Sequence, residues 1–220
     1  NIKNFVIDQN KINISEFRNL PQKLITQLND NFEVISLQQV DSIESSDGTT
    51  KFLFELDDKQ KIESVILIDE KERVTFCIST QSGCKMGCRI CQTGVMGFYR
   101  NLTYYEILSQ IFYLKNIKGR LDNIVFMGMG EPFDNTDEVL KALEILTADY
   151  GLQFSTRKIN VSTIGLVPGM KRFLEESKCN LAVSLSRTEH IQAEMLRFSI
   201  IFAALLALAA CSTPEPRFGP

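Results

Sequence analysis

The chain has 220 residues, of which 44% are hydrophobic and 23% are charged. This length and composition are sufficient to bury a folded core, which excludes an intrinsically disordered protein and leaves room for one large domain or two smaller ones. The net charge of -3 gives no overall sign of a nucleic-acid-binding protein.

Residues 1–70 are predicted to form a small α+β domain. Apolar residues recur at helical spacing between positions 20 and 32, behind Pro21, which predicts a short amphipathic helix. Residues 50–56 and 61–68 are apolar runs separated by the polar sequence DDKQ, and they predict a β-hairpin.

Residues 71–187 repeat a pattern of strand, loop and helix, which predicts parallel strands with right-handed crossovers, hence an open sheet or a barrel of the α/β class. In such folds ligands bind at the carboxyl ends of the strands. Those ends carry a cysteine-rich loop, then GMGEP, then STIGLVPG. The predicted strands are residues 74–79, 123–128, 158–163 and 180–186. The predicted helices are residues 102–117, 136–148 and 168–176, the first of them opened by a capping box of Thr103 and Glu106.

Charge is distributed unevenly along the chain. Residues 41–73 contain ten acidic and five basic residues, whereas residues 85–120 contain six basic residues and one acidic residue. A phosphate-bearing partner is therefore expected to meet the second stretch, although a solvated protein face has the same bias. The side chains expected to contact such a partner are Arg89, Arg100, Lys115, Lys118 and Arg120.

Residues 188–220 break the strand and helix pattern. Eleven uninterrupted apolar residues, 200–210, precede Cys211 and a proline-rich end. A bilayer span takes about 20 residues, so this run has instead the length of a signal-peptide core, and LAAC followed by Ser resembles a lipoprotein cleavage box. Because such a signal does not belong at a carboxyl terminus, we expect foreign sequence joined to a truncated natural chain. The alternative is a buried terminal helix.

Three of the six cysteines, Cys84, Cys88 and Cys91, have the spacing C-x3-C-x2-C. No signal peptide is recognised at the start of the sequence, so metal binding in the reducing cytoplasm is expected rather than a disulfide framework. Three thiolates can hold three irons of a 4Fe-4S cluster and leave the fourth open to S-adenosylmethionine, and this spacing after the first strand of an α/β fold is the radical S-adenosylmethionine signature. A zinc site would need a fourth ligand. The candidate cysteines outside the tail are Cys77 and Cys179. Three unligated structural thiols are the remaining alternative.

The surroundings of these cysteines match a known family. From Phe17 to Leu185 the chain resembles the radical S-adenosylmethionine methyltransferases that act on C2 of adenine in 23S ribosomal RNA and transfer RNA. The resemblance rests on SSDGTTKFLFEL, IESV, TFCISTQSGCKMGCRICQTG, GFYRNLT, NIVFMGMGEP, VSTIGLVPG and LAVSL in this order. It implies a partial (β/α) barrel after the small N-terminal domain, incomplete here because later strands are expected to be missing. It also implies a monomeric enzyme outside the membrane, with an external electron donor such as flavodoxin.

The resemblance assigns cofactor ligands to particular positions. Cys84, Cys88 and Cys91 would ligate the 4Fe-4S cluster, and Gly130 and Glu131 would bind the amino group of S-adenosylmethionine. The residues that would contact its ribose and carboxylate are Ser162, Ser184, Leu185 and Ser186. Two positions depart from the family: Ile90 stands where an aromatic residue is usual, and Ser186 where a histidine is usual.

The resemblance also assigns two catalytic residues. Glu63 would be the general base, and Cys77 would be the thiol that releases the RNA product by forming a disulfide. Residue type alone favours other interpretations, namely a solvated strand residue for Glu63, an inert buried thiol for Cys77 and a simple loop residue for Glu131.

The family mechanism needs a second thiol. One S-adenosylmethionine methylates a cysteine in the C-terminal region, and a second generates the radical that activates this methyl group for addition to C2. That segment lies beyond the resemblance, and Cys211 is not expected to replace it. The chain is therefore expected not to methylate RNA. The alternatives are another radical S-adenosylmethionine reaction, including C8 methylation of ribosomal adenine, and a non-catalytic iron–sulfur RNA-binding remnant.

Overall fold

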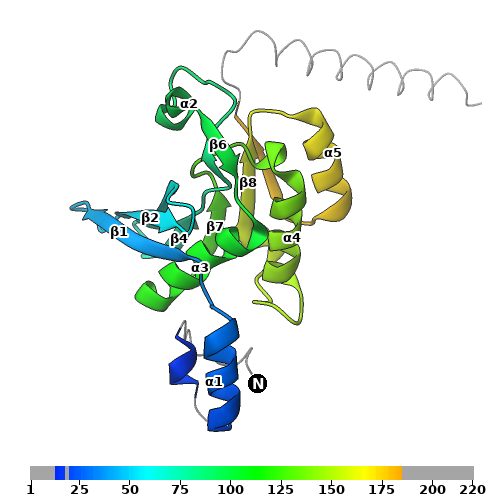
Figure 1. The fold of residues 1–220 in the computed structure, drawn as a ribbon. Helices are drawn as coiled ribbons and strands as arrows, with labels where there is room; N and C mark the ends of the chain where they lie inside the picture. The colour runs from blue at the N-terminus through cyan, green and yellow to red at the C-terminus, as the bar shows by residue number, and fades with distance from the viewer. Residues whose placement is uncertain (1–12, 18–19, 185–220) are drawn as a thin grey trace, which may run out of the picture.

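The computed structural model describes residues 13–17 and 20–184. Within them, seven strands form one sheet in the order β1-β2-β3-β4-β7-β8-β9 (Figure 1). The strands are β1 (Leu37–Glu44), β2 (Thr50–Leu56), β3 (Lys61–Ile68), β4 (Val74–Cys77), β7 (Asn123–Phe126), β8 (Ile159–Thr163) and β9 (Asn180–Val183). Strands β1 to β4 pair antiparallel, and β4, β7, β8 and β9 pair parallel. The predicted hairpin and parallel strands are confirmed, whereas the polar edge strand β1 was not predicted.

Three long helices cover one face of the sheet, and their apolar side chains form the main core with the strands (Figure 1). They are α3 (Tyr104–Lys118), α4 (Thr136–Thr147) and α5 (Val167–Glu176). The predicted capping box opens α3, because the Thr103 hydroxyl accepts from Glu106 N and the Glu106 carboxylate accepts from Thr103 N. The helix ends at Gly119, whose φ of 72° is the left-handed conformation that glycine tolerates.

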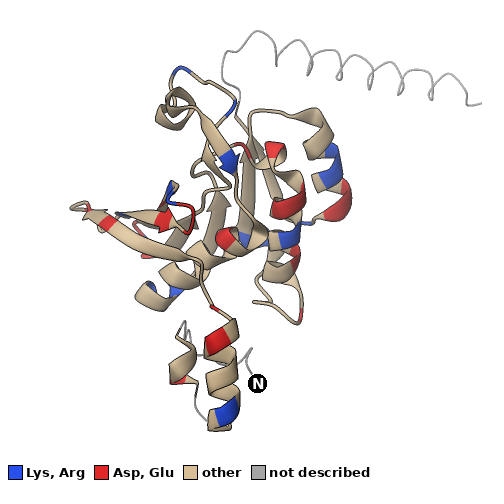
Figure 2. Cartoon of the chain, in the orientation of Figure 1, with Lys and Arg blue, Asp and Glu red and all other residues tan. Residues whose placement is uncertain are grey.

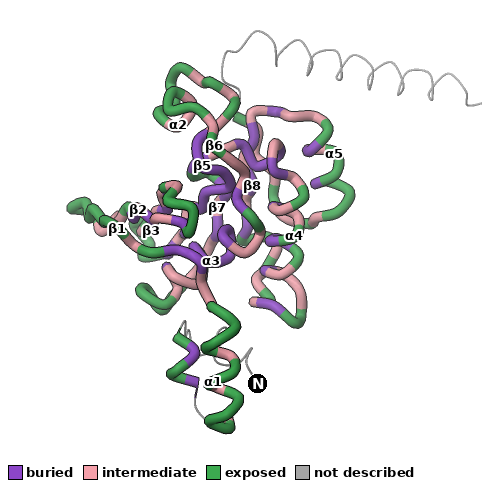
Figure 3. Tube along the Cα trace, in the orientation of Figure 1, coloured by how far each residue is buried: buried purple, intermediate pink, exposed green. Residues whose placement is uncertain are grey.

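Alternate side chains of the central strands lie on opposite faces of the sheet. Phe76, Ile124 and Val161 belong to the core that the strands share with the helices and are fully buried, whereas Cys77 and Ser162, on the other face, are half-buried. Figure 3 shows buried and intermediate segments together in the central strands. Among residues 13–17 and 20–184, no long helix contributes to a buried core on that second face. We call it the open face.

A small second hairpin lies at the carboxyl ends of the parallel strands. It consists of β5 (Gln81–Gly83) and β6 (Phe98–Asn101), with helix α2 (Gln92–Met96) between them (Figure 1). Two short 3₁₀ turns flank these strands: η3 (Pro132–Asp134) follows β7, and η4 (Thr156–Lys158) directly precedes β8. The sequence did not predict the hairpin, because strands of three and four residues carry too little periodicity to be recognised.

The N-terminal segment has a small core of its own. Helices η2 (Ile14–Glu16) and α1 (Gln22–Asn31) enclose Ile14 and Phe17, whereas β1, β2 and β3 share the main core. The division of the chain at residue 70 stays a prediction, although the described sheet continues across it through the β3–β4 pairing. No helix in the described ranges is long and apolar enough to cross a membrane. The predicted foreign tail, residues 188–220, lies outside the described residues.

Candidate functional site

The cysteine loop, residues 84–91, extends from the β5–β6 hairpin. Cys84 N donates to Gly97 O at 2.8 Å and Cys91 N donates to Cys88 O at 3.0 Å, so backbone hydrogen bonds close both ends of the loop. Gly83, which precedes the loop, has a φ of +75°, and a Cβ there would lie 2.0 Å from Gly97 O. Only glycine allows the two strands to approach this closely.

The three loop cysteines are free thiols; Cys84 and Cys88 are half-buried and Cys91 is exposed. In the described part of the chain, no group of three or more His, Cys, Asp and Glu side chains is already arranged around a metal position. Burial raises the pKa of the Cys84 thiol, and the negative charge of Glu131 adds to the effect, so Cys84 and Glu131 lie close enough to interact electrostatically. A bound metal would reverse this by favouring thiolates, and three clustered thiols are the donors that iron–sulfur clusters use. The donor set therefore fits the cluster.

Glu131 is a buried carboxylate, 3% exposed, that joins the ends of β7 and β8. Its Oε1 accepts from Phe133 N at 3.1 Å and from the Thr163 hydroxyl at 2.6 Å, and its Oε2 accepts from Ile164 N at 3.0 Å. Burial raises the pKa of Glu131 despite these hydrogen bonds. A carboxylate accepts about four hydrogen bonds, so one position remains for a donor such as the amino group of a ligand.

The two glycines of GMGEP, Gly128 and Gly130, allow this turn to pack closely against another segment of the chain. A Cβ on Gly128 would lie 2.7 Å from Ser79 Oγ, and a Cβ on Gly130, whose φ is +100°, would lie 2.5 Å from Gln81 Cβ. The turn therefore packs directly against the segment between β4 and β5. The contact of Gly130 with S-adenosylmethionine stays a prediction.

Four of the predicted site residues lie on or beside the open face. Ser162 of β8 and Ser184, directly after β9, place their hydroxyl oxygens 3.2 Å apart. Val65 pairs with Cys77 across β3 and β4, so Glu63, two residues before Val65, shares their face and is a diagonal neighbour of Cys77. Leu185 and Ser186 lie outside the described residues.

Both the backbone and the side chain of Glu63 bind neighbouring residues. The Ser79 hydroxyl donates to Glu63 O at 2.5 Å, and Glu63 N donates to Met129 Sδ at 3.3 Å, which ties this strand to the GMGEP turn. Lys51 Nζ lies 2.9 Å from Glu63 Oε1. Burial raises the pKa of Cys77 to about 11, so this thiol is protonated at neutral pH.

Buried amide side chains that the sequence analysis missed hold the loops in place. Gln110 of α3, which is fully buried, accepts from the Ser64 hydroxyl at 2.7 Å and from Ser79 N at 2.9 Å, and donates to Ser79 O at 3.0 Å. Asn135 donates to the carbonyls of Thr80 and Leu102 at 2.8 and 2.7 Å. For Gln110 the signal available in the sequence was a polar residue within an apolar run, which indicates a buried amide with specific partners. Asn135 stands among polar residues and gave no such signal.

The expected RNA-contacting cations do not form one surface. Arg89 lies in the cysteine loop and Arg100 on β6, whereas Lys115 and Lys118 lie in the last turn of α3 and Arg120 shortly after it. Figure 2 shows Lys and Arg residues spread over several elements. Arg100 is bound to acidic side chains of the protein, and Arg120 Nε lies 2.7 Å from Asp122 Oδ2. The contact of these five side chains with RNA stays a prediction, although α3 runs along the sheet and carries Lys115 and Lys118 away from Arg89 and Arg100.

Comparison with known proteins identifies related chains. The model of the Radical SAM superfamily matches residues 78–186. The chain is 46% identical over 184 residues to a probable dual-specificity RNA methyltransferase RlmN of Bacteroides thetaiotaomicron, covering 84% of this chain and 53% of that protein. It is 41% identical over 201 residues to the dual-specificity RNA methyltransferase RlmN of Syntrophobacter fumaroxidans, covering 90% and 58%.

The fold also matches a solved structure. The crystal structure of a radical SAM methyltransferase from Sphaerobacter thermophilus aligns with a TM-score of 0.79 and 38% identity, over 84% of this chain and 55% of that one. This match confirms the α/β fold. The chain spans about half the length of the curated relatives it matches.

Proposed function

Because this chain belongs to the radical S-adenosylmethionine family of RNA methyltransferases, we propose that it carries the cofactor-binding part of an enzyme that methylates C2 of a specific adenosine in 23S ribosomal RNA and transfer RNA. The observation that carries the proposal is the placement of its site residues. The cysteine loop, Glu131 and the Ser162–Ser184 pair all lie toward the carboxyl ends of the parallel strands, where α/β folds bind ligands.

The proposed cofactors are a 4Fe-4S cluster and S-adenosylmethionine, which the family implies. Cys84, Cys88 and Cys91 would hold the cluster. When bound, it supplies the electron that cleaves S-adenosylmethionine to methionine and a deoxyadenosyl radical. Glu131 would accept a hydrogen bond from the amino group of S-adenosylmethionine, and Ser162 and Ser184 would bind its polar groups from neighbouring strands.

Glu63 and Cys77 would act on the RNA from the open face. Glu63 would take the proton from C2 of the adenine, and Lys51 would keep its carboxylate oriented. Cys77 would stay a neutral thiol until it is needed to release the product, because its raised pKa suppresses the thiolate. A base that reaches this face must be unstacked and splayed out of its RNA. We also propose that the enzyme acts as a cytoplasmic monomer with an external electron donor such as flavodoxin.

Anaerobic reconstitution with iron and sulfide tests the proposal on this chain. We expect about four irons per chain and an electron paramagnetic resonance signal of the reduced protein that changes when S-adenosylmethionine is added. The control is the variant Cys84→Ala, Cys88→Ala, Cys91→Ala, and Cys179→Ala is the matched variant that should retain the signal. A folded wild-type protein that takes up zinc or no metal would contradict the proposal.

The products then separate this reaction from related ones. With an added chemical reductant to supply the electron, the reconstituted chain should cleave S-adenosylmethionine to methionine and deoxyadenosine, which is measured by chromatography. Deoxyadenosine with methylation of adenine at C8 in the RNA would indicate the related resistance-type reaction. RNA binding without any cleavage of S-adenosylmethionine would indicate a non-catalytic protein.

A further inference from the structure

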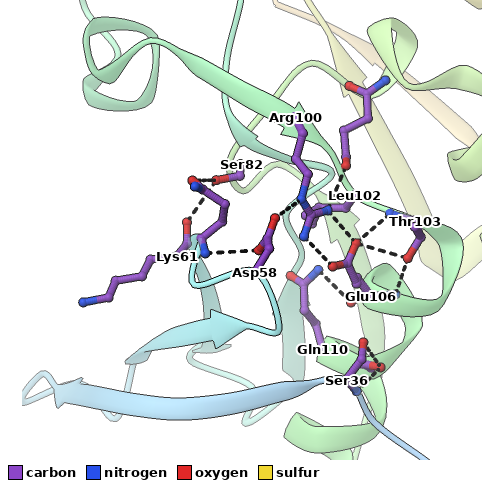
Figure 4. A network of polar contacts seen from close by, with 12 residues as sticks. Ser36, Asp58, Lys61, Ser82, Arg100, Leu102, Thr103, Glu106 and Gln110 are labelled. Atoms are coloured by element: carbon purple, nitrogen blue, oxygen red, sulfur yellow. Dashed lines mark hydrogen bonds and ion pairs between the residues drawn. The ribbon is translucent and has the colours of Figure 1, made fainter.

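A partly buried ion-pair network, in which Glu106 is buried and Asp58 is exposed, lies at the base of the cysteine loop. The loop extends from the β5–β6 hairpin, in which Ser82 pairs with Arg100 and Gly83 pairs with Phe98, directly before Cys84. The side chain of Arg100 reaches from β6 to the β2–β3 turn and to the start of α3 (Figure 4). Arg100 therefore lies where three elements meet. Its partner across the hairpin, Ser82, is two residues before Cys84.

The guanidinium of Arg100 uses four of its five donor positions. Nη1 and Nη2 donate to the two carboxylate oxygens of Glu106 at 2.9 and 2.7 Å, Nε donates to Asp58 Oδ2 at 2.5 Å, and Nη1 also donates to Asn101 O at 3.1 Å. The two parallel bonds to Glu106 need the planar fork of a guanidinium, which an ammonium group lacks.

Because Glu106 is buried, its charge depends on the ion pair with Arg100. Glu106 is 8% exposed, and burial by itself raises the pKa of its carboxyl. Hydrogen bonds from Arg100 and Thr103 outweigh this effect and hold the pKa below its ordinary value, so Glu106 is charged at neutral pH. Removing one partner of such a pair leaves a buried charge without compensation.

The hairpin has a second set of contacts on its other side. Gln81 Nε2 donates to Asp134 Oδ2 at 2.7 Å, and Lys85 Nζ forms an ion pair with the same carboxylate at 2.9 Å and lies 4.3 Å from the ring centroid of Phe98. These contacts attach the hairpin to the turn after β7. On the side of the β2–β3 turn, the Arg100 contact to Asp58 is supplemented only by long hydrogen bonds from Ser82, at 3.3 and 3.5 Å, among the described residues.

We propose that Arg100 is a positioning residue for the cysteine loop: by binding the β2–β3 turn and the first turn of α3 from β6, it holds the hairpin from which Cys84 begins. Its guanidinium is engaged by Asp58, Asn101 and Glu106, so it would act on Cys84, Cys88 and Cys91 through β5 and β6. The inference rests on the proposed function, because the arrangement serves catalysis only if this loop binds the cluster.

Thiol labelling of the metal-free chain tests the inference. In Arg100→Gln we expect Cys84 and Cys88 to be alkylated at least about tenfold faster than in the wild type, because the hairpin opens locally more often. Cys77 and Cys179 in the same molecule are internal references, read peptide by peptide with mass spectrometry. Equal acceleration of all these thiols would mean global destabilisation and would overturn the inference, as would no acceleration.

Arg172→Gln is the matched control variant. Arg172 also binds two carboxylates, Asp137 and Glu176, but it joins α4 to α5 away from the loop. Its loss should leave the rates at Cys84 and Cys88 unchanged. Arg100→Lys keeps the charge without the fork and should label nearly as fast as Arg100→Gln, so full restoration by lysine would contradict the positioning role.

A double variant separates positioning from charge compensation. Arg100→Gln with Glu106→Gln removes the buried charge as well as the guanidinium, so a restored labelling rate would show that Arg100 only neutralises Glu106 and would overturn the inference. We expect the rate to stay high, because the contact with Asp58 is still missing. Iron content after reconstitution should be reduced in Arg100→Gln. If the wild type binds no iron, the proposed function fails, whereas the labelling rates still decide the role of Arg100.

Discussion

At the scale of single residues, burial sets the protonation of the site. Cys77 on β4 has its pKa raised to about 11 from an ordinary value of 9.0, and Glu131 also has a raised pKa, in both cases chiefly because of burial. A thiol with a raised pKa favours the folded state at every pH below its unfolded value, and this contribution is lost as the pH rises from 9 toward 11. Cys77 is therefore a poor nucleophile until a base takes its proton.

The reactivity of Cys77 should follow this pKa. At pH 8, three units below about 11, roughly one Cys77 in a thousand is a thiolate. We expect its alkylation rate in the metal-free protein to rise about tenfold for each pH unit and to level off near pH 11. Peptide mass spectrometry after timed labelling measures this, with the denatured chain as control. A plateau near pH 9 in the folded protein would contradict the raised pKa.

At the scale of elements, the β5–β6 hairpin decides where the cysteine loop starts. Both Gly83 and Gly87 have positive φ, 75° and 59°, but their surroundings differ. A Cβ on Gly83 would collide with Gly97 O, whereas a Cβ on Gly87 would meet nothing within 4 Å. The first glycine is required by the packing of the hairpin and the second only by the backbone conformation.

Alanine substitutions at these two glycines should therefore differ in cost. Gly87→Ala should lower the free energy of unfolding by about 1–2 kcal/mol, the cost of a left-handed alanine. Gly83→Ala adds a steric overlap with the backbone of the facing strand and should cost a further 1–3 kcal/mol or so. Urea unfolding followed by circular dichroism measures both variants. Equal destabilisation would mean that the hairpin is not packed as closely as the structure has it.

At the scale of the whole molecule, two cores of unequal size are joined by few contacts. The main core contains the sheet and three helices, whereas Ile14 and Phe17 are the buried hydrophobic residues of the N-terminal core, and α1 buries none. Hydrogen bonds from the Tyr105 hydroxyl to Glu33 O, at 2.5 Å, and from Ser36 N to Ser109 Oγ, at 3.1 Å, connect the segment after α1 to α3.

The smaller core should open more readily than the larger one. We expect amide hydrogens of α1 to exchange at least about a hundredfold faster than those in the middle of α3, because α1 has little buried apolar surface. Hydrogen–deuterium exchange with peptide mass spectrometry measures both in one experiment, and α4 provides a second reference within the main core. Equal protection of α1 and α3 would show that the two parts unfold as one unit.

The sequence by itself determined the features that depend on local pattern. The parallel strands, the β2–β3 hairpin and the capping box at Thr103 follow from periodicity and from residues close in the chain, and the C-x3-C-x2-C spacing together with the surrounding motifs led to the family. It missed β1 because polar residues on a sheet edge resemble a loop, and it missed the β5–β6 hairpin because the strands are too short for a period to show.

Only the tertiary structure decided which distant groups meet. In the folded chain Arg100 binds Asp58 and Glu106, and Ser162 lies beside Ser184. Glu63 lies on the same face of the sheet as Cys77. The tertiary structure also separated cations that are close in sequence, because α3 carries Lys115 and Lys118 to the other end of the sheet. The physical reason is that these contacts depend on strand order and helix direction, which arise when apolar faces pack and which no local pattern of residues specifies.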